Sequence, residues 1–244
     1  MELVMACLLL VSFYFLSREA AVASGEIHTD EKLILVDAGH GGMDPGMVGV
    51  GNLEEKGINL IIAKMVREEL EEKGYQVVMT RTKDEGLYDE ESSNKKAQDM
   101  QRRISLIREK SPAVSVSIHQ NSYQDPSVKG PQVFYYEASA QGKILAETIQ
   151  EKLNQGLQVE RPRLAKGNTS YYLLKRSPGV LVIVECGFLT NAEEAEKLQT
   201  EEYQRMAAQA VTEGICEYME MAGGIEKICS FSDGAFKERP LLVY

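Results

Sequence analysis

Two histidines of this chain stand where predicted strands end, and imidazole is a common metal ligand. His40 follows the aliphatic run 33–36, and His119 closes the alternating run 114–119. Because the carboxyl ends of parallel strands lie at one edge of a sheet, we expect both imidazoles at that edge. A single histidine after a strand is more often a hydrogen-bonded core residue, so a metal site requires further partners.

Acidic side chains are available at the same predicted edge. The candidates are Asp37, Asp44, Glu54, Glu55 and Glu185. Two histidines and one glutamate are a common ligand set of catalytic zinc, with the fourth position left to water. Glu55 opens the helix after the His40 turn and is the natural carboxylate ligand, although a glutamate in a first helical turn can also serve only the helix dipole. Asp37 and Asp44 can serve only to cap and turn the chain.

Glu185 follows an all-apolar run, 180–184, where a carboxylate costs too much to bury without a partner. We therefore interpret it as an acid/base group beside the metal, in surroundings that raise its pKa toward the operating range. The residues thus predict His40, Glu55 and His119 as metal ligands and Glu185 as the catalytic residue.

The segment that carries His40, residues 37–46, is dense in glycine and proline. Such a segment can pass close to a ligand and adopt backbone conformations that are closed to other residues. It contains neither GxGxxG nor GxxxxGK[ST], so a phosphate-binding loop has little support.

Hydrophobic periodicity predicts an α/β fold, a single three-layer domain with a mostly parallel, twisted sheet of about six strands and helices on both faces. Helical stripes lie at 58–70, 100–107, 144–153 and 203–218, and predicted strands at 33–36, 75–80, 114–119, 133–136, 171–174 and 180–184. Ser115, Ser117 and His119 share one face of their strand, and we expect that face not to be buried. Residues 154–170 are predicted to form a loop, of a length that is often functional.

Composition predicts the domain organisation. Residues 1–23 are interpreted as a signal peptide or membrane anchor, because 3–16 are almost wholly apolar yet shorter than a bilayer span, and 21–23 offer an A-x-A cleavage pattern. Residues 24–32 are then a linker, 33–222 the catalytic domain and 223–244 a tail without an assigned role. We therefore predict an exported, extracytoplasmic protein that contacts a membrane only through its N-terminal segment.

Charge and cysteine content exclude two classes of protein. The net charge of −10 argues against a nucleic-acid partner, because a phosphate-binding surface needs a basic face. The four cysteines show no CxxC spacing, so we expect free thiols packed as small hydrophobic groups rather than a disulfide framework.

Four blocks of sequence occur in a characteristic order: DAGHGGMDPG at 37–46, EK at 55–56, SIHQN at 117–121 and VECGFLTN at 184–191. They resemble the zinc-dependent N-acetylmuramoyl-L-alanine amidases of the Amidase_3 type, and the likeness extends over residues 32–220. This resemblance implies that His40, Glu55 and His119 hold Zn²⁺, that Glu185 is the catalytic carboxylate and that Arg103 is structural. The sequence departs from the family pattern at Ile107-Arg108, where many members carry Ala-Asn, which leaves the metal site untouched.

The resemblance also implies a reaction, hydrolysis of the amide that joins the lactyl group of N-acetylmuramic acid to L-alanine in peptidoglycan. The chain is most similar to the spore-cortex amidases of endospore formers. That likeness implies cortex peptidoglycan as the substrate, a step toward muramic δ-lactam, and a location in the cell wall or the forespore intermembrane space. Because such amidases can depend on an accessory lipoprotein, it also implies that kind of partner.

Two other interpretations stay open at this point. One is a zinc peptidase that cuts within the stem peptide, and the other is a wall-binding module whose metal only holds the fold. Glu185 argues against the binding module, because a structural zinc site is usually closed by four protein ligands.

Overall fold

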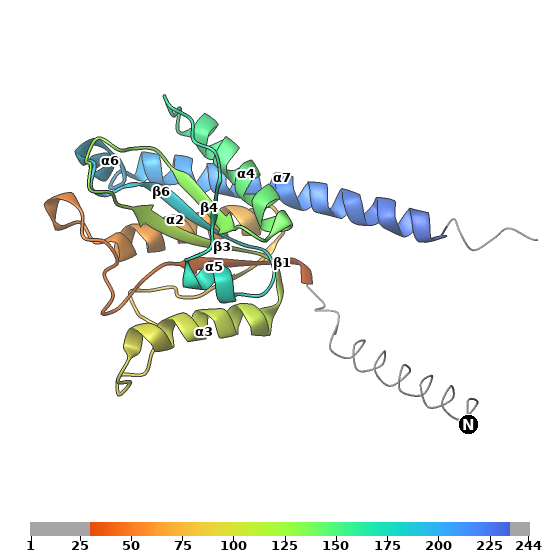
Figure 1. The fold of residues 1–244 in the computed structure, drawn as a ribbon, viewed down its shortest axis with the longest axis horizontal. Helices are drawn as coiled ribbons and strands as arrows, with labels where there is room; N and C mark the ends of the chain where they lie inside the picture. Colours follow the sequence, from red (N-terminus) through yellow and green to blue (C-terminus); the bar gives the residue numbers. More distant parts are fainter. Residues whose placement is uncertain (1–29, 235–244) are drawn as a thin grey trace, which may run out of the picture.

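The computed structural model describes residues 30–234, with side chains described from 32 to 223. The predicted leader (1–23), residues 24–29 of the predicted linker and residues 235–244 of the tail lie outside this part of the chain. The described residues form one six-stranded sheet between two layers of helices, which confirms the predicted α/β class (Figure 1). Within residues 30–234, no helix has the length and apolarity needed to cross a membrane.

The sheet has the strand order β2-β1-β3-β6-β4-β5. Its strands are β1 (Asp30–Ala38), β2 (Gln76–Met79), β3 (Pro112–Asn121), β4 (Gln132–Tyr136), β5 (Lys166–Asn168) and β6 (Leu181–Phe188). All neighbours pair in parallel except β4 and β6, which are antiparallel. The carboxyl ends of the central strands β1, β3 and β6 therefore lie at one edge, named here the carboxyl edge.

Helices cover both faces of this sheet. On one face lie α2 (Glu55–Glu72), α4 (Ala140–Gly156) and α7 (Glu201–Gly234), and on the other α3 (Lys95–Lys110) and α5 (Tyr172–Arg176) (Figure 1). The short helices η1 (Val50–Asn52) and α6 (Ala192–Lys197) follow β1 and β6. The hydrophobic core is correspondingly divided, with the larger cluster under α2, α4 and α7 and the smaller one under α3 and α5.

The two ends of the predicted catalytic domain differ from the observed elements. β1 begins at Asp30, which pairs with Pro112, so residues 30–32 belong to a strand rather than to the predicted linker. At the other end, α7 continues past residue 222 to Gly234. Cys186 and Cys216 are free thiols, as predicted for them.

Residues 171–174 were expected as a strand, and this prediction is wrong. α5 begins at Tyr172, and its Leu173 and Leu174 are buried in the smaller core. A short apolar run can bury its side chains either as a strand or as one helical turn, so periodicity could not distinguish them. The edge of the sheet is formed instead by β5, within the predicted loop 154–170.

Both faces of β3 are buried, contrary to the expectation for the face that carries Ser115 and Ser117. These serines are 1% and 0% exposed. Helix α3 covers this face, and the Ser117 hydroxyl donates to Oδ2 of Asp37, so the small polar side chain is satisfied inside the protein. His119 reaches partial exposure because it lies at the carboxyl edge.

Candidate metal centre

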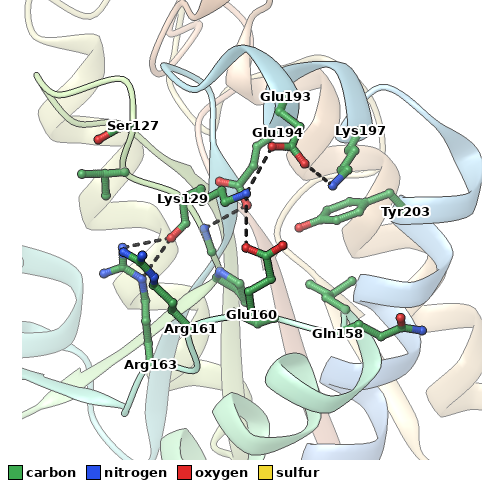
Figure 2. A pocket seen from close by; sticks show the side chains of 15 residues that line it. Ser127, Lys129, Gln158, Glu160, Arg161, Arg163, Glu193, Glu194, Lys197 and Tyr203 are labelled. Carbon is green, nitrogen blue, oxygen red and sulfur yellow. Dashed lines mark hydrogen bonds and ion pairs between the residues drawn. The ribbon is translucent and has the colours of Figure 1, made fainter.

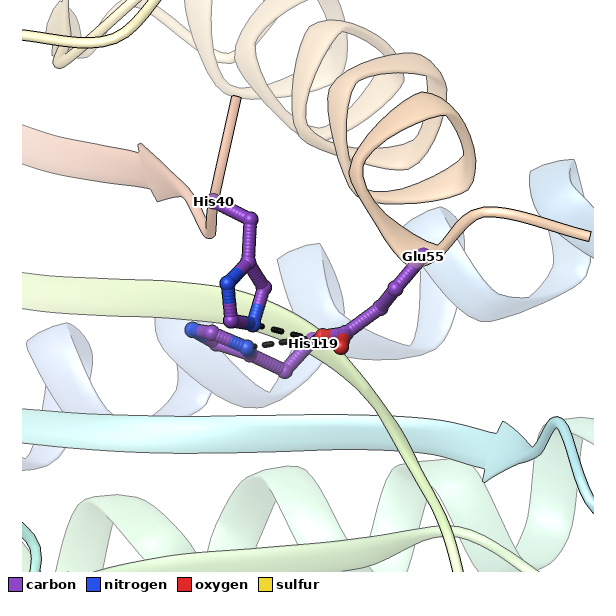
Figure 3. Close-up of side chains that lie close together, drawn as sticks. All are labelled: His40, Glu55 and His119. Carbon is purple, nitrogen blue, oxygen red and sulfur yellow. Dashed lines mark hydrogen bonds and ion pairs between the residues drawn. The ribbon is translucent and has the colours of Figure 1, made fainter. Parts of the chain in front are cut away.

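The three predicted ligand residues meet at the carboxyl edge (Figure 3). His40 follows β1, His119 lies near the end of the adjacent strand β3, and Glu55 is the first residue of α2. The parallel pairing of β1 with β3 ends at Ala38 and Ile118, two residues before His40 and one residue before His119, which makes the two imidazoles neighbours. One possible ligand atom from each of the three side chains lies within 4.8 Å of the others.

The carboxylate of Glu55 lies between the two imidazole rings. Its Oε1 is 2.9 Å from Nδ1 of His119, and its Oε2 is 3.2 Å from Nε2 of His40. Zn²⁺ commonly takes two imidazoles and one carboxylate in catalytic sites, with water in the remaining position. The donor set therefore fits a zinc ion.

These three groups also shift one another's protonation. Burial alone would lower the pKa of His40, but the hydrogen bonds and charges of Glu55 and Asp44 raise it to about 9. Burial would raise the pKa of Glu55, whereas hydrogen bonds from both rings hold it well below its usual range. A cation that binds here must displace a proton from His40, so its binding should release protons and weaken as the pH falls.

Glu55 is held in place by further donors. Its Oε1 accepts hydrogen bonds from Nδ2 of Asn59 (3.1 Å) and the backbone amide of Gln120 (3.0 Å), and its Oε2 accepts one from the amide of Met47 (2.8 Å). These bonds fix both carboxylate oxygens toward the histidines.

Two glycines leave the space that the cluster occupies. Gly46 has a φ of 70°, and a Cβ there would collide with the Glu55 carboxylate and the His40 ring. Gly39 lies against the other imidazole, since a Cβ at this position would collide with the ring of His119.

The backbone of His40 is left-handed, with a φ of 60°. Few non-glycine residues adopt this conformation, and they do so where the surroundings hold them in place. Nδ1 of His40 is 2.9 Å from Oδ2 of Asp44, and the other oxygen of this carboxylate, Oδ1, pairs with Lys96 at 2.9 Å. Since a carboxylate on the far ring nitrogen sets the orientation of an imidazole, Asp44 directs Nε2 toward Glu55 and does more than turn the chain.

Arg103 holds the segment that carries His40 in place through buried hydrogen bonds and ion pairs. Its guanidinium is 2% exposed, pairs with Asp37 and with Asp99 (2.6 Å), and donates to the carbonyl of His40 (2.7 Å). Burial would raise the pKa of Asp37, but the charge of Arg103 and two hydroxyl hydrogen bonds lower it to about 2. The result is a buried, hydrogen-bonded ion pair directly under the end of β1.

Arg81 joins the two segments that carry His40 and Glu55. It is 2% exposed and donates to the carbonyl of Gly39 (2.9 Å), next to His40, and to that of Lys56 (2.8 Å), next to Glu55. Sequence reasoning did not single out this residue. The signal that could have found it is its position, two residues beyond the end of β2 and at the same edge of the sheet.

Glu185 lies beside His119, its partner in the register between β3 and β6. Its side chain is buried, and its Oε2 has no hydrogen-bond partner among the described residues. Burial raises its pKa to about 7, against the opposing charge of His119. A carboxyl group in this state can take up or give up a proton near neutral pH.

One of the acidic candidates lies apart from this cluster. The side chain of Glu54 is half exposed and pairs with Lys56 at 3.4 Å, away from the imidazoles.

Comparison with known proteins places this arrangement among cell-wall enzymes. Residues 34–217 match the model of the family Amidase_3, described as N-acetylmuramoyl-L-alanine amidase. The chain is 38% identical over 197 residues to the germination-specific N-acetylmuramoyl-L-alanine amidase of Bacillus subtilis, covering 79% of this chain and 81% of the relative.

Solved structures share the fold. The CwlD amidase of Clostridioides difficile, solved in complex with the GerS lipoprotein, superposes with a TM-score of 0.76 at 36% identity and covers 78% of this chain and 99% of that chain. The amidase AmiC2 of Nostoc punctiforme gives a TM-score of 0.68 at 33% identity, with coverage of 79% and 99%.

Proposed function

The chain belongs to the Amidase_3 family and is an N-acetylmuramoyl-L-alanine amidase, and from this premise we propose that it works with Zn²⁺ held by His40, Glu55 and His119 and with Glu185 as its catalytic carboxylate. Enzymes of this class cleave the amide between the lactyl group of N-acetylmuramic acid and L-alanine of the peptidoglycan stem peptide. The observation that carries the proposal is the meeting of two imidazoles and a carboxylate beside a buried glutamate, one oxygen of which has no hydrogen-bond partner within residues 30–234.

Zn²⁺ bound by this donor set would act as a Lewis acid on the scissile carbonyl and make a water molecule easier to deprotonate. The other tasks fall to the chain itself. Asp44 orients the ring of His40, and Asn59 with the amide of Gln120 keeps the Glu55 carboxylate in position. Because these groups are fixed before substrate arrives, the site has little reorganisation to do during the reaction.

Glu185 moves the proton. Its Oε2 accepts a proton from the attacking water and returns it to the nitrogen of the departing L-alanine, so that the amine leaves as a neutral group. The burial that raises its pKa to about 7 suits both steps, since each protonation state is accessible at neutral pH.

We also propose a role in spore-cortex maturation. The support is the likeness to a germination-specific amidase and to an amidase that was solved with a lipoprotein. In this role the protein is exported, removes stem peptides from cortex peptidoglycan ahead of muramic δ-lactam formation, and works with an accessory lipoprotein.

The reaction is tested by digestion of purified peptidoglycan with zinc-supplemented protein and identification of the products by mass spectrometry. Intact stem peptides that begin with a free L-alanine are expected. Shortened stems that remain on the glycan would identify a peptidase instead, and binding without any release would identify a wall-binding module.

Two variants separate the proposed roles. Glu185→Gln should lower kcat by about 10²–10⁴-fold while zinc content stays unchanged, because it removes proton transfer alone. His119→Ala should lower zinc content itself, measured by elemental analysis. Glu213→Gln, at an exposed position of α7, is the matched control and should change neither quantity.

A further inference from the structure

A cavity of about 580 Å³ lies outside the metal centre (Figure 2). One wall is the loop before β4, residues 127–131, and another is the segment 157–163 after α4. The remaining wall comes from α6 and the first turn of α7. We name it the α4–α6 cavity. Its size is that of a small-ligand site, and the segment 157–163 lies within the stretch 154–170, whose predicted loop length is often functional.

The acidic groups of this cavity already have partners. Glu193 pairs with Lys129 (3.2 Å) and Lys197 (2.7 Å), and Glu160 lies 3.8 Å from Lys129. Glu194 accepts hydrogen bonds from the backbone amides of Gly130, in one wall, and of Phe188, at 2.9 and 2.8 Å. These three carboxylates therefore brace the cavity and are not free to bind a cationic ligand.

Two arginines of the same cavity have no carboxylate partner among the described residues. Arg161 is exposed and makes no hydrogen bond or ion pair within residues 30–234. Arg163 donates to the carbonyl of Lys129 (3.0 Å), and its guanidinium lies 5.3 Å from the ring centre of Phe188. In a chain of net charge −10, two guanidinium groups without acidic partners at a cavity indicate a place for an anion.

A bulge in β6 connects this cavity to the catalytic residues. His119 pairs with Glu185 and Asn121 with Phe188, so β6 contains one more residue than β3 over this stretch. Because the extra residue re-aims the side chains that follow, Phe188 returns to the face of the sheet that carries Glu185. Arg163 therefore lies over the ring of a residue that is three positions from Glu185 in β6, roughly 10 Å along the backbone.

We propose that the α4–α6 cavity binds a carboxylate of the substrate's stem peptide through Arg161 and Arg163. The proposal rests on the amidase function, which requires a peptide to extend from the scissile bond. Three extended peptide residues span about 10 Å, which matches the separation along β6. A guanidinium presents a planar fork of donors that suits a carboxylate, and Phe188 keeps that of Arg163 in place.

The test compares two muramoyl peptides that differ only at the peptide end, one with a free terminal carboxylate and one with a carboxamide. For the double variant Arg161→Gln/Arg163→Gln, we expect kcat/KM on the carboxylate substrate to fall by about 10–100-fold, through KM, as for the loss of charge-assisted hydrogen bonds. The same variant should act on the carboxamide as the unchanged protein does. Zinc content and kcat should stay constant.

Arg108→Gln, at an exposed position of α3, is the control for loss of one positive charge. Equal losses on both substrates, a change confined to kcat, or no change at all would overturn the proposal. If the double variant folds poorly, Arg161→Gln alone gives the same test, because that side chain makes no hydrogen bond or ion pair in the described part of the chain. Should the unchanged protein hydrolyse neither substrate, the amidase function fails, and calorimetric titration with the free stem peptide and its carboxamide still tests the cavity.

Discussion

Two pairs of arginines serve this molecule in different ways. Arg81 and Arg103 lie buried beneath the metal centre, where backbone carbonyls and carboxylates satisfy their guanidinium groups. Arg161 and Arg163 border the α4–α6 cavity and lack acidic partners among the described residues. A fully hydrogen-bonded, buried arginine fixes its neighbours, whereas an open one is available to a ligand. Hydrogen-bond partners, rather than residue type, therefore distinguish an arginine that positions its neighbours from one that is available to a ligand.

The largest effect is expected from Arg103→Met. This change leaves the buried carboxylate of Asp37 without its counterion, which typically costs about 3–5 kcal/mol. Urea unfolding of the zinc-free protein measures the loss. Arg102→Met, on the same helix, breaks only an exposed pair with Asp89 and should cost at most about 1 kcal/mol. Similar losses for the two variants would contradict the contrast between buried and exposed arginines.

The dependence of stability on pH gives a second test of the buried pair between Arg103 and Asp37. The folded-state pKa of Asp37 is about 2, below its ordinary 3.8, so its stabilising contribution is present above pH 3.8 and is lost as the pH falls toward 2. The loss amounts to roughly 2 kcal/mol. In Arg103→Met, burial acts on Asp37 without the opposing charge and raises its pKa, so this contribution should reverse. The measurement is the urea midpoint of the unchanged protein and of Arg103→Met between about pH 5 and about pH 2. If the two midpoints change with pH in parallel, Arg103 does not lower the pKa of Asp37.

Arg81→Gln should weaken zinc binding by about 10–100-fold, because it unties the segments of His40 and Glu55 without changing a ligand. Competition with a colorimetric chelator measures the affinity. Arg81→Lys keeps the charge but not the planar fork of donors. Its zinc affinity should lie between those of the unchanged protein and Arg81→Gln. An unchanged zinc affinity in both variants, with lower thermal stability only, would reduce Arg81 to a structural residue.

The smallest effect is expected at the cavity. Arg161→Gln/Arg163→Gln should change the free energy of unfolding by about 1 kcal/mol or less, because only one hydrogen-bonded carbonyl and one ring contact of Arg163 are lost. Zinc affinity should also stay the same. A loss comparable to that of Arg103→Met would show that these arginines hold the fold rather than await a ligand.

The strand ends made the meeting of the three proposed ligand residues predictable. His40 and His119 follow strands of clear pattern, and Glu55 opens the next helix, so the topology of a parallel sheet is enough to bring them to one edge. Glu185 could be singled out from the sequence because a carboxylate at the end of an apolar strand is costly to bury without a partner. The roles of these residues stay proposals, but their meeting is a matter of geometry.

Other features depend on contacts that no local pattern contains. Arg81 binds carbonyl oxygens, which every residue has, so nothing in the sequence marks its partners. Ser117 is buried because Asp37 and α3 lie against it, and α5 is helical because β5 already forms the edge of the sheet. These outcomes are decided by tertiary packing, which local periodicity does not report.

The absence of a Cβ atom at Gly39 leaves the space that the ring of His119 occupies. The imidazole of His119 occupies the volume where any other residue at position 39 would place its first side-chain carbon. One methyl group would therefore displace the ring of His119 from the cluster, although no ligand residue had been substituted. We therefore expect Gly39→Ala to abolish metal binding, although position 39 contributes no ligand atom and no reactive side chain.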